Sequence, residues 1–404
     1  MSRNSNWMKG AGCAAVIALC AGVATAQTEH SASNCPPLVC VSRTDDDASA
    51  PKPGMLRYAI VNAPDNAVIT FDPSIAGQTV TLDGRGPGNQ IKLTRNVCIQ
   101  GPGPSQLTIS GGHTTRIFFV SGAAVEISGL TLTGGIAAGG DGGAGSGGSG
   151  GGGGAAGLGG AIFVNSGSLT LSQVTLTGNR CSGGNGGAGG SGFGAGRGGG
   201  GGGFGGPSPH GPLGGAPGDL TANGTAEGSG GIGGNAESFA EPGGEAGWAG
   251  GGGGGGFTAH TGVGRGAPGG AGGFAGGVGG GGAFLDAEGG AIAAGGGTGG
   301  SALGGAVFVR SGRLVLHDAA FINNAAVGGL GGSGTPNGVA KGGAIFVCSS
   351  YYCGPGHDGT ATAYGKTFFS SSTAAQAGED PACSGRDDRD VCGMLKTVEN
   401  ESKQ

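Results

Sequence analysis

Residues 159–184 read GGAIFVNSGSLTLSQVTLTGNRCSGG, and residues 304–329 read GGAVFVRSGRLVLHDAAFINNAAVGG, a second copy of one unit at a constant offset of 145 residues. Apolar residues such as Leu169 and Leu171 alternate with polar or small ones, which is the periodicity of a β-strand. A Ser-Gly pair in each copy supplies a turn. An internal repeat of short strands and tight turns indicates a repeat fold.

The same pattern extends beyond these two copies. A third copy opens with GGAIFV at residues 342–347, and the fragment GGAI occupies residues 289–292. Upstream, residues 67–82, 96–112 and 116–135 alternate in the same way. Strands this short bury a core only if coils of roughly 20 to 30 residues stack on one another and pair in parallel sheets. The sequence therefore predicts an all-β fold, a parallel β-helix.

A glycine-rich insertion separates the two clearest copies. The chain has 108 glycines, and they make up nearly half of residues 181–300. Glycine loses the most backbone entropy on ordering and has no side chain to bury, so the first interpretation of residues 183–303 is a loop that is mobile or held only by backbone hydrogen bonds. The alternative is a bundle of polyglycine helices, which needs small residues wherever backbones touch. Residues 134–160 form a smaller insertion of the same kind.

The N-terminus has the pattern of an exported protein. Residues 1–26 combine Arg3 and Lys9, an apolar run and the ending Ala-Thr-Ala, which predicts a signal peptide cleaved before Gln27. No later segment predicts a membrane span. The formal net charge of −5 and the lack of a basic cluster argue against nucleic acid as a partner.

Eight cysteines follow the predicted signal peptide, and an even number in an exported chain favours disulfides. Several lie close together near the two ends of the predicted solenoid, where local bridges would close the caps, although the connectivity stays open. Zinc is disfavoured because there is no CxxC pair and no His at ligand spacing. The disulfide candidates are Cys35, Cys40, Cys98, Cys181, Cys348, Cys353, Cys383 and Cys392.

Two resemblances to known families follow from these motifs. GGAI, GGAV and FINN resemble the GGA[ILV] and FxxN repeats of the polymorphic outer-membrane protein family. The segment LRYAIVNAPDNAVITF, from residue 56, is similar to the start of bacterial right-handed β-helix repeat proteins, which implies a right-handed, pectate-lyase-like solenoid with LRYAI as a short capping helix. The repeat positions are Gly159, Gly160, Ala161, Asn179, Gly304, Gly305, Ala306, Phe321, Asn324, Gly342, Gly343 and Ala344.

Enzymatic activity is disfavoured. LRYAI and the stretch DGRGPG at residues 83–88 are also similar to pectate lyases, but such an enzyme needs clustered acidic residues to hold Ca²⁺ and an Arg or Lys base. Acidic residues are sparse in the predicted coils, and no RxPxxR segment follows. The dipeptide His357-Asp358 lies among glycines and a proline, so a turn is the simpler interpretation. We predict no catalytic, cofactor-binding or metal-binding residues and no cofactor.

The expected protein is an exported, adhesin-like structural or binding protein that contacts carbohydrate or surface protein. One alternative is a divergent polysaccharide lyase or glycosidase, and a third option is an ice- or surface-binding protein built on flat repeated strands. Members of the resembling family carry a C-terminal autotransporter barrel, and residues after Cys392 lack the pattern of barrel strands. The expected location is secreted, periplasmic or cell-surface-associated. The predicted segments are the signal peptide 1–26, a cysteine-containing segment 27–53, N-terminal coils 54–182, the insertion 183–303, C-terminal coils 304–376 and a cysteine-containing tail 377–404.

Overall fold

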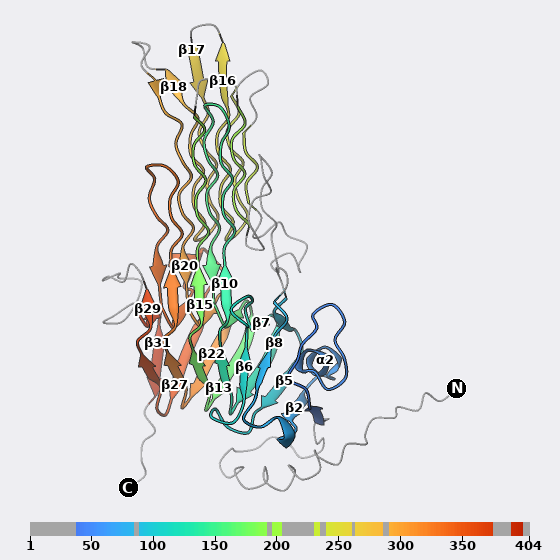
Figure 1. The fold of residues 1–404 in the computed structure, drawn as a ribbon. Helices are drawn as coiled ribbons and strands as arrows, with labels where there is room; N and C mark the ends of the chain where they lie inside the picture. The colour runs from blue at the N-terminus through green and yellow to red at the C-terminus, as the bar shows by residue number, and fades with distance from the viewer. Residues whose placement is uncertain are drawn as a thin grey trace.

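The computed structural model describes residues 38–84, 89–191, 196–203, 230–234, 240–260, 263–285, 291–374 and 389–398. The predicted signal peptide, Cys35 and Cys383 lie outside these residues. Most described strands belong to stacked parallel sheets that form the lower body of the molecule in Figure 1, and helices are few. The prediction of an all-β fold with parallel sheets is confirmed.

Three long sheets enclose the core of this β-body, and every neighbouring pair in them is parallel. Sheet 1 has the order β1 (Leu38–Val41), β2 (Ala67–Phe71), β5 (Val97–Gln100), β8 (Ala123–Ser128), β13 (Gly167–Ser172), β22 (Arg313–His317), β27 (Thr360–Tyr364) and β31 (Leu395–Val398). Sheet 2 has the order β28 (Phe368–Ser370), β23 (Ala320–Ile322), β14 (Thr175–Thr177), β9 (Thr131–Thr133), β6 (Thr108–Ser110) and β3 (Thr79–Thr81). Sheet 3 has the order β30 (Val391–Cys392), β26 (Ile345–Val347), β21 (Val307–Val309), β12 (Ile162–Val164), β7 (Phe118–Val120) and β4 (Ile91–Leu93).

Two shorter parallel sheets lie where the chain leaves and re-enters the β-body. Sheet 4 consists of β10 (Ile136–Ala138), β15 (Arg180–Ser182), β24 (Ala325–Val327) and β29 (Thr373–Ala374). Sheet 5 consists of β11 (Gly157–Leu158), β20 (Ala302–Leu303) and β25 (Ala340–Lys341). Small side chains of these two sheets share one buried cluster, which includes Ala137, Cys181, Ala302, Ala326 and Ala340. Such residues allow the two sheets to approach closely.

The two copies of the repeat stack directly on each other despite the long insertion between them. Leu169 pairs with Leu314 and Leu171 with Leu316, so each residue lies beside its counterpart 145 positions later. These leucines are fully buried in the main core. Because side chains alternate along a strand, one register aligns all the interior residues of both copies.

The GGA motif joins sheet 5 to sheet 3 through two glycines with different roles. Gly159 has φ +60°, a left-handed conformation that other residues rarely adopt. A Cβ on Gly160 would lie 2.3 Å from the carbonyl oxygen of Gly305 in the next copy. The first glycine therefore makes the turn, and the second lets neighbouring copies touch.

The LRYAI segment forms α2 (Leu56–Asn62), and a 3₁₀ turn, η2 (Pro73–Ile75), follows β2. Leu56, Ala59 and Ile60 of α2 belong to the main hydrophobic core. The helix therefore closes the N-terminal end of the β-body, as the resemblance to β-helix repeat proteins implies.

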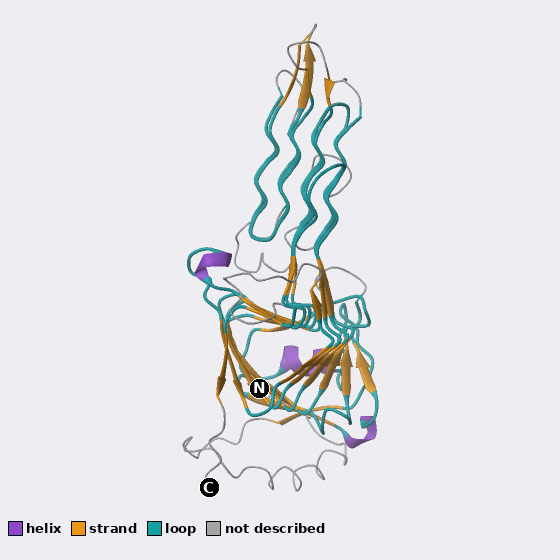
Figure 2. Cartoon of the chain, turned by 90° about the vertical axis from the view of Figure 1, so that its left-hand side faces the viewer, coloured by secondary structure: helices purple, strands orange, loops and turns teal. Residues whose placement is uncertain are grey.

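Glycine-rich segments form a second structural unit, here called the glycine bundle, at residues 139–157, 183–191, 196–203, 230–234, 240–256, 266–283, 293–301 and 328–339. These segments run side by side away from sheets 4 and 5 (Figures 1 and 2). At the far end the bundle carries two antiparallel pairs, β16 (Phe257–His260) with β17 (Val263–Gly266), and β18 (Phe284–Leu285) with β19 (Ala291–Ile292).

Residues 150–156 form a central segment whose hydrogen bonds repeat every three residues. Gly150 donates to Gly255 O and Gly153 to Gly252 O, both on one neighbouring segment. A three-residue period is that of a polyproline II or polyglycine helix. The central segment exchanges hydrogen bonds with six neighbours, at residues 140–143, 184–187, 199–202, 249–255, 277–280 and 295–298.

Mutual contact of these backbones explains why the bundle is made of glycine. A Cβ on Gly150, Gly152 or Gly154 would lie about 2 Å from a carbonyl oxygen of a neighbouring segment, at 1.9, 2.1 and 2.0 Å respectively. In the described residues of the glycine-rich block, these contacts and the three-residue hydrogen-bond period are compatible with packed polyglycine helices. Hydrogen bonds between the segments stabilise the order that side-chain burial does not provide.

The expectation that all eight cysteines form disulfides is wrong for Cys98 and Cys181, which are free thiols. Each lies in a different sheet, where the cross-strand neighbours of Cys98 are Val68 and Glu126 and those of Cys181 are two alanines. Cys348 and Cys353 are bonded to each other, with an S–S distance of 2.00 Å. Cys40 and Cys392 also take part in disulfide bonds.

This arrangement predicts the reactivity of the two thiols. Burial raises the pKa of Cys181 to about 12, and burial together with the nearby Glu126 raises the pKa of Cys98. In the folded protein at neutral pH we expect slow alkylation of both and the slower reaction at fully buried Cys181. After unfolding without reductant, mass spectrometry should find both residues alkylated. Protection of either one in the unfolded chain would mean that it is disulfide-bonded.

A deletion tests whether the β-body folds without most of the bundle. Removing residues 186–300 joins two adjacent points, because Gly300 donates to Gly184 O at 2.9 Å. With a short Gly/Ser linker, the chain should keep its β-rich circular dichroism spectrum and its cooperative unfolding, since the repeat copies pair directly with each other. Loss of the β signal, or aggregation, would mean that the body depends on the bundle.

Candidate functional site

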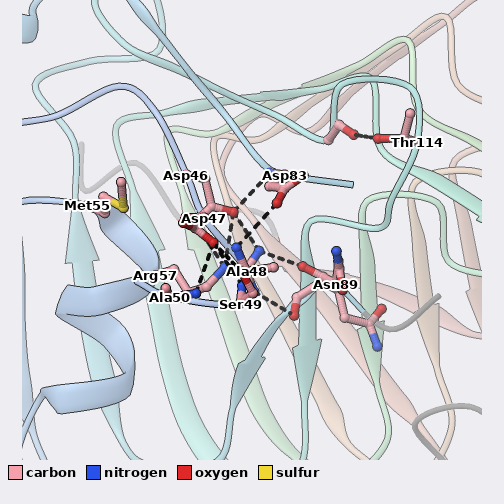
Figure 3. Close-up of polar contacts among 12 residues, drawn as sticks. Asp46, Asp47, Ala48, Ser49, Ala50, Met55, Arg57, Asp83, Asn89 and Thr114 are labelled. Atoms are coloured by element: carbon pink, nitrogen blue, oxygen red, sulfur yellow. Dashed lines mark hydrogen bonds and ion pairs between the residues drawn. The ribbon is translucent and has the colours of Figure 1, made fainter. Parts of the chain in front are cut away.

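A polar cavity of about 560 Å³ lies at the N-terminal end of the β-body. Figure 3 shows its acidic residues around the start of α2, where Arg57 binds Asp46 through two guanidinium nitrogens. The closest contact is 2.6 Å, and both side chains are buried. Arg57 also donates to the backbone carbonyl of Asn89 at 2.6 Å. The cavity is lined by Asp45, Asp46, Asp47, Ala48, Ser49, Lys52, Met55, Asp83 and Asn89.

The hydrogen bonds of these carboxylates hold the local chain. Asp47 accepts hydrogen bonds from the Ser49 hydroxyl and from the N–H groups of Ser49 and Ala50, and the hydroxyl contributes most to lowering the pKa of Asp47. Asp46 also accepts from the N–H of Asp83 at 3.0 Å. Within the described ranges no group of three or more His, Cys, Asp or Glu side chains has the arrangement of a metal site. We interpret this cluster as structural, because its hydrogen bonds hold the chain before α2 against α2 and Asp83 at the N-terminal end of the β-body.

A second candidate region begins with a column of phenylalanines on sheet 3. Phe163 stacks on Phe119 and Phe308 with ring centroids 5.2 and 5.1 Å apart, and Phe308 stacks on Phe346 at 5.5 Å. Their neighbours on the same strands, such as Ile162, face the main core instead. The phenylalanines therefore form a separate cluster on the opposite face of sheet 3.

The glycine bundle covers this column with two aromatic side chains. Trp248 packs edge-on against Phe163 and at a tilt against Phe308, with centroid distances of 6.4 and 6.2 Å. Phe274, from another turn of the bundle, stacks on Trp248 at 5.0 Å. Aromatic contacts of this kind add about 0.5–1.5 kcal/mol per pair beyond area burial. The cluster therefore joins the bundle to the β-body.

Polar side chains add to this contact between the glycine bundle and the β-body. The guanidinium carbon of buried Arg310 lies 4.0 Å from the centre of the Trp248 ring, a cation–π contact. Arg310 also donates to the Asn165 side chain at 3.0 Å, and its Nη2 lies 3.3 Å from His357 Nε2. The other ring nitrogen of His357 lies 3.2 Å from the Ser311 hydroxyl. These contacts fix the bundle base against the loop that carries His357.

That loop, residues 348–359, follows β26 and is closed by the Cys348–Cys353 disulfide. It contains the short helix α3 (Ser350–Cys353), drawn as the purple helix beside the bundle base in Figure 2. Asp358 accepts hydrogen bonds from the Ser350 hydroxyl and from the Ser350 N–H, the latter at 2.6 Å. The bond from the hydroxyl is the main cause that lowers the pKa of Asp358. We refer to residues 348–359 as the stapled loop.

The side chains of the dipeptide His357-Asp358 have different partners in the structure. His357 contacts Arg310 and Trp248, whereas Asp358 contacts Ser350, so the two side chains do not act on one partner. Among the other histidines, His317 stacks on Tyr364 at 5.0 Å. Trp248 and Phe274 carried no signal in the sequence beyond being isolated aromatics in a glycine-rich segment.

The repeat asparagines form a buried ladder. Asn179 donates its amide N–H to Asn324 Oδ1 at 3.0 Å and accepts from the Gly135 N–H at 2.9 Å. Asn324 in turn donates to the Leu176 carbonyl at 3.0 Å. Both side chains thus pair backbone groups of neighbouring copies, and Phe321 and Leu176 occupy equivalent buried positions.

Comparisons of the chain with protein-family models, with curated proteins and with solved structures found no match. Among the described residues, no helix is long and apolar enough to cross a membrane.

Proposed function

We propose that the chain is an exported, non-enzymatic binding protein, built on a right-handed parallel β-helix, that contacts carbohydrate or protein at a cell surface. The stacked parallel sheets and the in-register repeat copies support the β-helix. Disulfides and the N-terminal sequence pattern support export. Its GGA repeats support a family relationship to the polymorphic outer-membrane repeat proteins.

The main support for the binding proposal is the way the glycine bundle presents its side chains. Its interior is filled by backbone, so its larger side chains project from the outside. Asp141, Asn185 and Leu330 lie in one row across three adjacent segments, since Asp141 accepts from the Asn185 N–H and Asn185 accepts from the Leu330 N–H. In its described residues, a unit of this kind presents side chains on a hydrogen-bonded backbone support whose interior is filled by other backbone segments.

Binding arrays test this proposal. The chain beginning at Gln27 should bind members of a glycan array or an extracellular-matrix protein array without changing them. Incubation with uronate polymers and Ca²⁺ is the matched assay for the lyase alternative. A rise in absorbance from unsaturated products would contradict the non-enzymatic part of the proposal. The absence of any retained ligand on both arrays would contradict the binding part.

A further inference from the structure

Tyr351 is the most exposed of the large hydrophobic side chains in the described part of the chain, with 83% of its surface accessible. It lies on α3 of the stapled loop. Its neighbour Tyr352 is half-buried and packs edge-on against Phe346, with ring centroids 6.0 Å apart. Tyrosine is well suited to contacts because it combines a large apolar ring with a polar tip and has few rotatable bonds.

Several contacts order the backbone of the loop around Tyr351 before any ligand arrives. The Cys348–Cys353 disulfide closes the loop, and both cysteines are buried. Tyr351 packs edge-on against Tyr352 at 5.8 Å, and Asp358 fixes the preceding residue, Ser350. A pre-ordered loop loses little conformational entropy on binding, which favours affinity.

The surroundings of Tyr351 favour a sugar over a protein surface. The rest of the loop supplies hydroxyls, glycines, a proline and the Asp358 carboxylate, and it offers no other exposed large apolar side chain. A stable protein interface buries about 800 Å² on each partner around an apolar centre. A sugar ring is smaller, with an apolar C–H face that fits one aromatic ring and hydroxyls that fit a carboxylate.

We propose that the stapled loop is a polysaccharide-binding site in which Tyr351 stacks on the C–H face of one sugar unit. Asp358 binds Ser350, the residue before Tyr351, and its carboxylate has acceptor capacity beyond those two hydrogen bonds for the sugar hydroxyls. The inference rests on the proposed binding function and names its ligand class.

The test uses the chain beginning at Gln27 and three probes, which are cellulose, chitin and polygalacturonate, in pull-down and affinity-electrophoresis assays. Tyr351→Ala should weaken binding to the retained polysaccharide about tenfold or more, as loss of a central aromatic contact does. Tyr351→Trp should keep it. Met394→Ala, which removes another exposed apolar side chain, is the matched control. Circular dichroism should be the same for all variants because Tyr351 covers no core.

The assays distinguish an error in the site from an error in the ligand class or in the binding function. If a polysaccharide binds and Tyr351→Ala binds it equally well, the site is wrong and the binding function stands. If only matrix proteins bind, and Tyr351→Ala abolishes that binding, the ligand class is wrong. If the chain retains none of the three polysaccharides and no array ligand, both the site and the binding function are overturned.

Discussion

Replacing Gly152 with alanine is expected to unfold the glycine bundle while leaving the β-body folded. The new Cβ would lie 2.1 Å from the carbonyl oxygen of Gly200. Overpacking of a folded interior costs about 1–3 kcal/mol when side chains can shift, and sometimes more. Here the obstacle is backbone, so relief requires separating segments that Gly152 joins by its hydrogen bonds with Gly143 and Gly187. Amide hydrogen exchange should show fast exchange throughout the bundle.

Gly281→Ala is the matched control within the same bundle. A Cβ at this position meets only one atom, the carbonyl oxygen of Ala267 at 3.7 Å, which is an ordinary van der Waals contact. This variant should keep the slow exchange of the original protein. Equal protection in the two variants would contradict the backbone-to-backbone packing assigned to the central segment.

Leu171→Ala is expected to destabilise the β-body by about 2–5 kcal/mol, the range for removing a fully buried leucine. Leu171 has no exposed surface and lies between Ile127 and Leu316 in sheet 1, so a cavity would open inside the stack. The midpoint of denaturant unfolding, at constant slope, measures the change. Thr170→Ser, one residue away on the outward face, should shift it little, and equal shifts would mean that the inward face is misassigned.

The repeat made the β-body predictable from sequence. Leu169, Leu171 and their counterparts 145 residues later alternate with polar residues, and that local pattern determines which side chains face inward. The LRYAI helix was predictable only through the resemblance. The pairing of Cys348 with Cys353 is one of several connectivities that the spacing allowed.

The order of the glycine-rich block was not predictable in the same way. Each segment, taken alone, loses backbone entropy and gains no side-chain burial, so its sequence resembles that of a mobile loop. Its order depends on neighbours that are distant in sequence, such as the bonds from Gly150 to Gly255 and from Gly151 to Gly295. The junction around Trp248 is equally non-local, because its partners Phe163 and Arg310 lie in different repeat copies.

The side-chain-free interior of the glycine bundle gives the two parts of the protein different heat capacities of unfolding. Unfolding the β-body exposes leucine, isoleucine and phenylalanine, and apolar exposure raises the heat capacity. Unfolding the bundle exposes mainly peptide groups, and polar exposure lowers it. Hydrophobic stabilisation weakens on cooling, so the β-body loses stability in the cold, whereas the bundle has a flatter stability curve. The stability of the glycine bundle is therefore less sensitive to low temperature than the stability of the β-body.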